Sequence, residues 1–116
     1  MATLGARDPD HARFWDVAEP FLGSGRVDEG TMMGHQCLRS PSGGFVATVA
    51  RGTGDLVVKL PKARVSELIE TGEGAAFAPA GKVFREWVAI GGGTDERWSA
   101  LIEESIEFVE GGVGAG

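Results

Sequence analysis

Apolar residues near the start of the chain recur at the spacing of one helical face, i, i+3, i+4, i+7 and i+8. They are Phe14, Val17, Ala18, Phe21 and Leu22. Residues 8–10, Asp-Pro-Asp, form a typical helix start, because the aspartate accepts hydrogen bonds from free amides and proline suits the first turn. We predict a first helix over residues 9–22. Pro20 should bend it or end it early, because proline has no N–H to donate to the carbonyl of Asp16.

Three segments after this helix are short and bordered by glycine-rich loops, which favours strands over helices. They cover residues 31–39, 45–51 and 56–60. The loops between them contain Gly, Ser, Pro and Asp, the composition that closes hairpins. We therefore predict an antiparallel three-strand meander. Its middle strand is apolar or small on both faces, as in a strand that is covered on both sides.

A second helix and a fourth strand follow. Pro61 opens the helix, and its apolar stripe runs up to Gly72. The next loop, residues 72–81, is made of small residues, and we expect Phe77 to anchor it at the edge of the core. Residues 82–90 resume a strand pattern with broken alternation, which allows a bulge.

The last predicted helix starts at a cap formed by Thr94 or Asp95, after three glycines. Its apolar face consists of Trp98, Leu101, Ile102, Ser105, Phe108 and Val109. Its opposite face carries four acids that we expect to be solvated, Glu103, Glu104, Glu107 and Glu110. Residues 111–116 offer little to bury and are predicted to form a disordered glycine-rich tail.

The predicted order of elements is α-β-β-β-α-β-α, which defines an α+β fold. We expect a single domain over residues 1–110, with an antiparallel sheet of a three-strand meander plus a fourth strand, and three helices. A chain of 116 residues can bury one modest core without disulfides.

The lone cysteine, Cys37, excludes an internal disulfide and favours a reducing compartment. Charges interrupt the first fourteen residues, and no apolar run reaches the roughly 18 residues of a membrane span. The expected location is cytoplasmic, with no membrane partner.

The charge is acidic overall but unevenly distributed. Eleven lysines and arginines stand against seventeen aspartates and glutamates, a net charge of −6 that repels phosphate backbones. Only residues 59–85 are net positive, with five basic and three acidic residues. The candidate contacts for an anion or a partner are Lys59, Lys62, Arg64, Lys82 and Arg85. Most such charges are ordinary solvated surface groups, and Lys59 is expected to pair with Glu67 or Glu86.

Residues 30–109 resemble a known family, the TfoX N-terminal domain and its relatives of the MmcQ/YjbR type. The resemblance is carried by GTMMGHQCLR at residues 30–39, LVVKLPKARVSELIETGEG at 56–74, FAPAGKVFREWVAI at 77–90 and WSALIEESIEFV at 98–109. It implies a compact α+β domain without catalytic residues to carry over. Some relatives are associated with competence regulation and others with DNA binding, but neither role attaches to a residue here.

Other constellations are weak. His35 and Cys37 lie on one face of a strand, but a metal site needs further ligands, and a buried inert thiol is the simpler interpretation. Residues 91–93 lack the spacing of a phosphate-binding loop and are expected to form a flexible connection. We predict a non-enzymatic binding or regulatory domain with no cofactor, whose partner is a protein or a small ligand. The alternatives are DNA binding through residues 59–85 and, more weakly, a small enzyme that uses Lys59 or Cys37.

Overall fold

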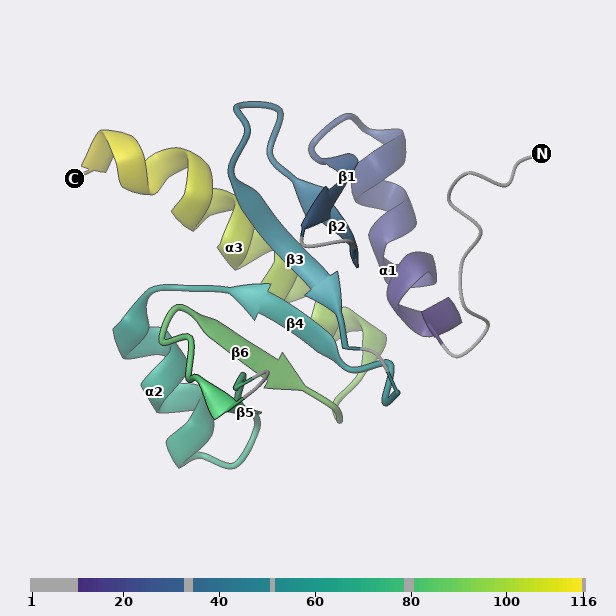
Figure 1. Ribbon diagram of the computed structural model, residues 1–116. Coiled ribbons are helices and arrows are strands. Elements are labelled where there is room, and N and C mark those ends of the chain that lie inside the picture. The colour runs from purple at the N-terminus through teal and green to yellow at the C-terminus, as the bar shows by residue number, and fades with distance from the viewer. Residues whose placement is uncertain (1–10, 33–34, 51, 79–80, 116) are drawn as a thin grey trace.

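The computed structural model describes residues 11–32, 35–50, 52–78 and 81–115, without the side chains of Met32, His35 and residues 112–115 (Figure 1). The predicted helix start at residues 8–10 lies outside this description. The elements are α1 (Ala12–Gly23), β1 (Asp28–Met32), β2 (His35–Arg39), β3 (Phe45–Val49), β4 (Leu56–Lys59), α2 (Lys62–Glu70), β5 (Ala75–Ala76), β6 (Trp87–Ile90) and α3 (Asp95–Ala115).

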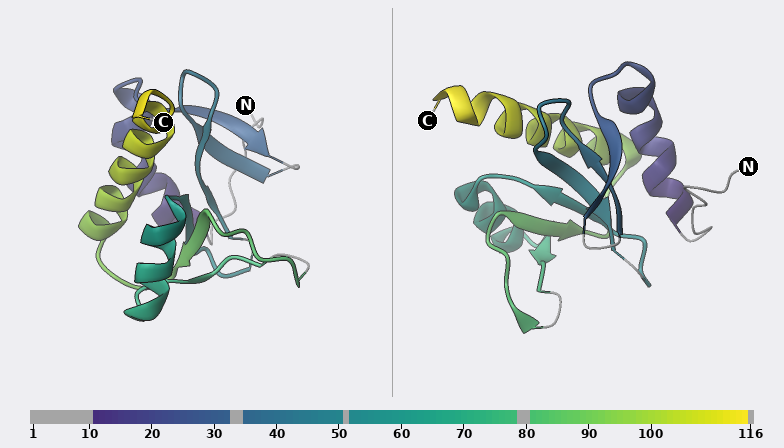
Figure 2. Two further views of the ribbon diagram at one scale, coloured as in Figure 1. Left: turned by 90° about the vertical axis from the view of Figure 1, so that its left-hand side faces the viewer. Right: turned by 45° about the horizontal axis from the view of Figure 1, so that its top comes forward.

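The strands form one antiparallel sheet in the order β1-β2-β3-β4-β6-β5. The helices gather on one side of the twisted sheet, where α3 crosses its middle and α2 lies at its β5–β6 end (Figures 1 and 2). This confirms the predicted α+β class, the meander and the later antiparallel strand. No helix in the described part of the chain is long and apolar enough to cross a membrane.

The core lies between α3 and the sheet. Trp98, Leu101 and Ile102 of α3 are at most 1% exposed. They belong to one cluster with buried residues of α1, α2, β2, β3, β4 and β6, among them Phe14, Leu38, Val58, Leu68 and Ile90. Burying an aliphatic side chain of this size stabilises a fold by about 1.5–3 kcal/mol relative to exposure. The apolar face predicted for the last helix is therefore the face that joins the layers.

The segment predicted as one strand over residues 31–39 is a hairpin, and that prediction was wrong. β1 pairs with β2 from Asp28↔Arg39 to Met32↔His35. Asp28, Glu29 and Gly30 have low strand propensity, so the pattern did not reveal β1. A Cβ atom at Gly30 would lie 2.5 Å from Cδ of Arg39, so a larger residue there would require the Arg39 side chain to move.

The strand predicted over residues 82–90 is shorter than expected. β6 covers only Trp87–Ile90, and the two-residue strand β5 pairs with its outer edge. The preceding residues form a turn, in which the Trp87 amide donates to the Phe84 carbonyl over 3.2 Å. The irregular alternation of residues 82–90 thus reflects a loop and a short strand.

The helix ends also differ from the prediction. Pro20 lies inside α1, which continues to Gly23 because the loss of one hydrogen bond in the last turn does not end the helix. α3 continues to Ala115, so the backbone is helical over most of the predicted tail. A helix that is already formed extends at low cost, because each added residue gains a hydrogen bond.

The start of α3 is fixed on both sides. The Thr94 hydroxyl accepts a hydrogen bond from the Arg97 amide over 3.0 Å, so Thr94 is the cap, one of the two residues predicted for that position. The glycine loop before it contributes two carbonyls. Gly92 accepts from the indole of Trp98 over 2.9 Å, and Gly93 accepts from Arg13 over 2.7 Å. The loop thus helps to hold the core tryptophan.

Candidate functional site

Lys59, the last residue of β4, lies beside the first residues of β6. Its ammonium is 4.0 Å from a carboxylate oxygen of Glu86 and 6.0 Å from the ring centroid of Trp87. The register of the sheet sets this geometry, because Lys59 is paired with Trp87 across the two strands. Of the two predicted partners of Lys59, Glu67 and Glu86, the structure shows Glu86.

Arg64 does not share this surface, because it joins α2 to α3. Its guanidinium donates to both carboxylate oxygens of Glu104, over 3.0 and 3.1 Å, and to Glu67 over 2.6 Å. These hydrogen bonds raise the pKa of Arg64, with burial acting in the opposite direction. Arg64 therefore has a structural role, and its charge is not available as one of the five candidate contacts for an anion or a partner.

The other three candidate cations are exposed. Lys62 begins α2, and Lys82 and Arg85 lie in the loop between β5 and β6. Within the described part of the chain, none of the three takes part in an ion pair or hydrogen bond of its side chain. Their charges are available to a partner.

Three aromatic rings gather at the base of the β5–β6 loop. The ring centroid of Phe77 is 5.9 Å from that of Phe84 and 6.5 Å from that of Trp87. The Phe84 amide donates to the Phe77 carbonyl over 3.0 Å and so closes the loop. All three rings are half-buried, and the neighbouring Val83 is 54% exposed. Phe77 packs against Phe84 and Trp87, in a ring cluster that the sequence did not predict.

We call this region the basic–aromatic surface. It consists of Lys59, Phe77, Lys82, Val83, Phe84, Arg85 and Trp87. The sequence signal was present, since three aromatic residues and two cations fall within residues 77–87. It was missed because the stretch from residue 82 onward was interpreted as a strand.

Cys37 is a buried residue of β2 and is 0% exposed. Burial raises the pKa of its thiol, Arg39 lowers it and Glu29 raises it further. A thiol with a raised pKa stays protonated at neutral pH and is a poor nucleophile. The side chain of His35 lies outside the description. Among the described side chains, no three His, Cys, Asp or Glu residues lie close enough to hold a metal ion.

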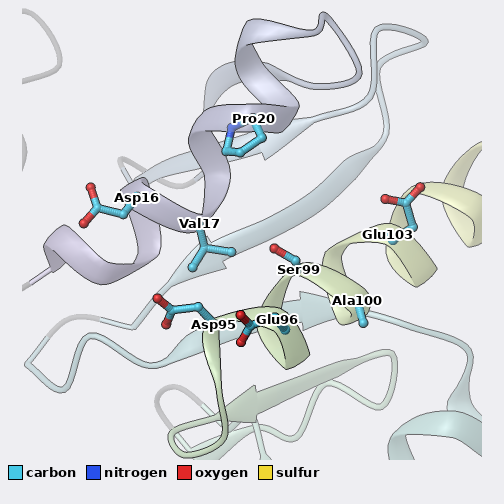
Figure 3. Close-up of a pocket in the computed structure, with 8 residues that line it drawn as sticks. All are labelled: Asp16, Val17, Pro20, Asp95, Glu96, Ser99, Ala100 and Glu103. Carbon is cyan, nitrogen blue, oxygen red and sulfur yellow. The ribbon is translucent and has the colours of Figure 1, made fainter.

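A hollow, which we call the acidic groove, lies between α1 and the first two turns of α3 (Figure 3). Its volume is about 510 Å³. It is lined by Asp16, Val17, Pro20, Asp95, Glu96, Ser99, Ala100 and Glu103. Two of its acids are paired, Asp95 with Arg13 over 2.7 Å and Glu103 with Arg26 over 2.6 Å.

The acids of α3 do not form the simple solvated face that the sequence predicted. Glu103 pairs with Arg26, and Glu104 pairs with Arg64. Glu110 accepts a hydrogen bond over 2.7 Å from the hydroxyl of Ser40, a buried residue of the β2–β3 turn. These partners are distant in sequence, so helical periodicity alone could not reveal them.

Comparisons with protein-family models, with curated proteins and with solved structures found no match to this chain. The fold and its two charged surfaces define a small α+β domain in which a cationic surface and an acidic groove lie near opposite ends of β6.

Proposed function

We propose that this chain is a non-enzymatic binding domain that holds an acidic segment of a partner protein on the basic–aromatic surface. The observation that carries the proposal is the gathering of Phe77, Phe84 and Trp87 beside exposed cations that have no described partner. The resemblance to the TfoX N-terminal domain agrees with a binding or regulatory role. It remains a prediction.

The apolar part of the surface supports protein binding. Aromatic residues and arginine are enriched at the centres of protein interfaces, where large rings bury much area with little loss of side-chain entropy. Trp87 and Phe84 are half-buried already, so their positions are set before a partner arrives. Preorganisation of this kind lowers the entropic cost of association.

The charged part of the surface favours an acidic partner. Lys82 and Arg85 have no described counter-ion, and Lys59 shares only the 4.0 Å contact with Glu86. The net charge of −6 opposes an acidic ligand at long range. At physiological salt, however, the Debye length is about 8 Å, so the nearest cations determine the local attraction.

Single-stranded nucleic acid is the second candidate, because rings that stack on bases and cations that contact phosphates form the usual platform for it. The pairing of Arg64 with Glu104 weakens this candidate, since it removes one of the five cations. Duplex DNA of arbitrary sequence should bind no tighter than about 0.1 mM at physiological salt.

The test is fluorescence anisotropy with two labelled probes of equal length, a peptide of alternating glutamate and leucine with one tryptophan, and oligothymidine. We expect Arg85→Glu to weaken peptide binding by roughly tenfold, as the loss of a charged anchor beside an aromatic contact would. Arg26→Glu is the matched control, because it changes the net charge equally near β1, at the opposite edge of the sheet from β5.

Equal weakening by Arg26→Glu and Arg85→Glu, or no peptide binding at all, would contradict the proposal. Binding of oligothymidine at micromolar concentration that Lys82→Glu abolishes would instead support nucleic-acid binding as the function. A contact with six to ten phosphates must also lose roughly 10³ to 10⁵ in affinity between 50 and 200 mM salt.

A further inference from the structure

The acidic groove combines an apolar floor with a rim of one charge sign. Val17 and Pro20 of α1 line one side of it, and Ser99 and Ala100 of α3 line the other (Figure 3). Its volume, about 510 Å³, falls in the usual range of ligand sites, about 300–1,000 Å³. Every titratable side chain that lines it is a carboxylate. The shape admits one or two side chains of a peptide.

Internal ion pairs neutralise only half of the rim. Arg13 holds Asp95, and Arg26 holds Glu103. Asp16 and Glu96 are exposed, and neither has an ion pair or a side-chain hydrogen bond with another described residue. Two negative charges without a partner among the described residues therefore remain, one on each helix that forms the groove.

The backbone adds a third acceptor. Pro20 stands four residues after Asp16 and has no N–H, so the Asp16 carbonyl lacks the donor that an α-helix normally supplies. A carbonyl without its helical donor, in a residue that lines the groove, suits a group with several N–H donors, such as an ammonium or a guanidinium.

The arrangement fits a polymeric cation better than a metal ion. No three described carboxylates lie close enough to share one ion, so the charge is spread along the groove. A lysine or arginine stem can cover apolar residues while its charged end reaches a carboxylate. The apolar floor between Asp16 and Glu96 provides such a path.

We propose that the acidic groove binds a lysine- or arginine-bearing segment of a partner protein, with aliphatic stems on Val17, Pro20 and Ala100 and the cationic ends at Asp16 and Glu96. This site is independent of the basic–aromatic surface. The groove lies at the start of α3, beyond the last residue of β6, whereas Trp87 is the first residue of that strand.

The test is a titration of the isotope-labelled chain with an eight-residue acetylated peptide that contains three lysines and two leucines, followed by amide chemical shifts and calorimetry. We expect the largest shifts at Val17, Ser99 and Ala100. Asp16→Asn with Glu96→Gln should weaken binding by roughly tenfold, as the loss of two surface charge contacts would. The matched control, Glu70→Gln with Glu107→Gln, removes two exposed acids elsewhere and should change the affinity by less than about twofold.

Equal weakening in the two double variants would show attraction to net charge alone and would overturn the proposal. Shifts centred away from α1 and α3, or no binding by the lysine peptide at low salt, would also overturn it. All four substituted residues are exposed, so the variants should fold, and circular dichroism checks this. None of the substituted residues lies within residues 77–87, and the peptide is cationic. The outcome therefore does not depend on the basic–aromatic surface.

Discussion

Trp98 and Trp87 show two different environments for the same side chain. Trp98 is 1% exposed, its indole N–H donates to Gly92, and the guanidinium of Arg13 lies 3.9 Å from its ring centroid. Trp87 is half-buried, with Phe77 on one side and Lys59 at 6.0 Å. Trp98 has its partners within the fold, whereas Trp87 keeps part of its ring available.

The difference follows from what covers each ring. α3 lies over the middle of the sheet, and its residue Trp98 is buried in the core between them, while a loop closed by backbone hydrogen bonds flanks Trp87 (Figure 1). One tryptophan should therefore matter for stability and the other mainly for binding. The two tryptophans thus distinguish the core, which stabilises the fold, from the basic–aromatic surface, to which we assign binding.

Replacing the core tryptophan should have the largest effect. We expect Trp98→Ala to lower the free energy of unfolding by about 3–5 kcal/mol, because it empties a buried aromatic site. Urea unfolding followed by circular dichroism measures this. A loss below roughly 1 kcal/mol would mean that the site is not buried as described.

Replacing the surface tryptophan should cost less stability. For Trp87→Ala we expect a loss of about 1–2 kcal/mol in the same assay, since the ring is half-buried and its neighbours can fill part of the space. The variant should stay folded and lose affinity for the acidic peptide. A loss equal to that of Trp98→Ala would make Trp87 a core residue and remove the contrast.

The smallest expected effect on stability comes from an ion pair that links α3 to the loop that follows α2. Arg97 donates to both carboxylate oxygens of Glu73, to Oε1 over 2.9 Å, and this hydrogen bonding lowers the pKa of Glu73. The ordinary pKa of glutamate is about 4.3. The stabilisation is therefore present above that pH and is lost as the pH falls through the lower pKa of the folded state.

We expect the free energy of unfolding of the wild type to exceed that of Glu73→Gln by less than about 1 kcal/mol near neutral pH, because the Arg97–Glu73 pair is partly exposed. Urea unfolding at several pH values should show this difference shrinking below about pH 4.3. Glu70→Gln, which changes an exposed acid without a described partner, should show no such trend. A difference for Glu73→Gln that stays constant down to pH 3 would refute the assignment.

The spacing of apolar and capping residues along the chain predicted the elements that depend mainly on interactions between residues close in sequence. The apolar stripes predicted all three helices, and Thr94 was recognisable as a cap. β1 was missed because Asp28, Glu29 and Gly30 do not favour a strand, and pairing with β2 overrides that preference. Such an override depends on contacts that a pattern along the chain does not contain.

The candidate site was predictable in part for the same reason. Lys59 was predicted to pair with Glu67 or Glu86, and Glu86 is the one it contacts, since both residues lie in segments predicted as strands. Arg64 appeared free because its main partner, Glu104, lies forty residues away on another helix. Phe77 and Trp87 come together only through the pairing of β5 with β6.

The most direct test of the proposed binding surface uses tryptophan fluorescence. Trp15 and Trp98 are 4% and 1% exposed, so Trp87 supplies most of the indole that acrylamide can reach. We predict that a saturating amount of the acidic peptide, with its tryptophan replaced by phenylalanine, protects the wild type from quenching and leaves the quenching of Trp87→Phe unchanged. Wild-type quenching that the peptide does not alter, or protection that persists in Trp87→Phe, would contradict the account.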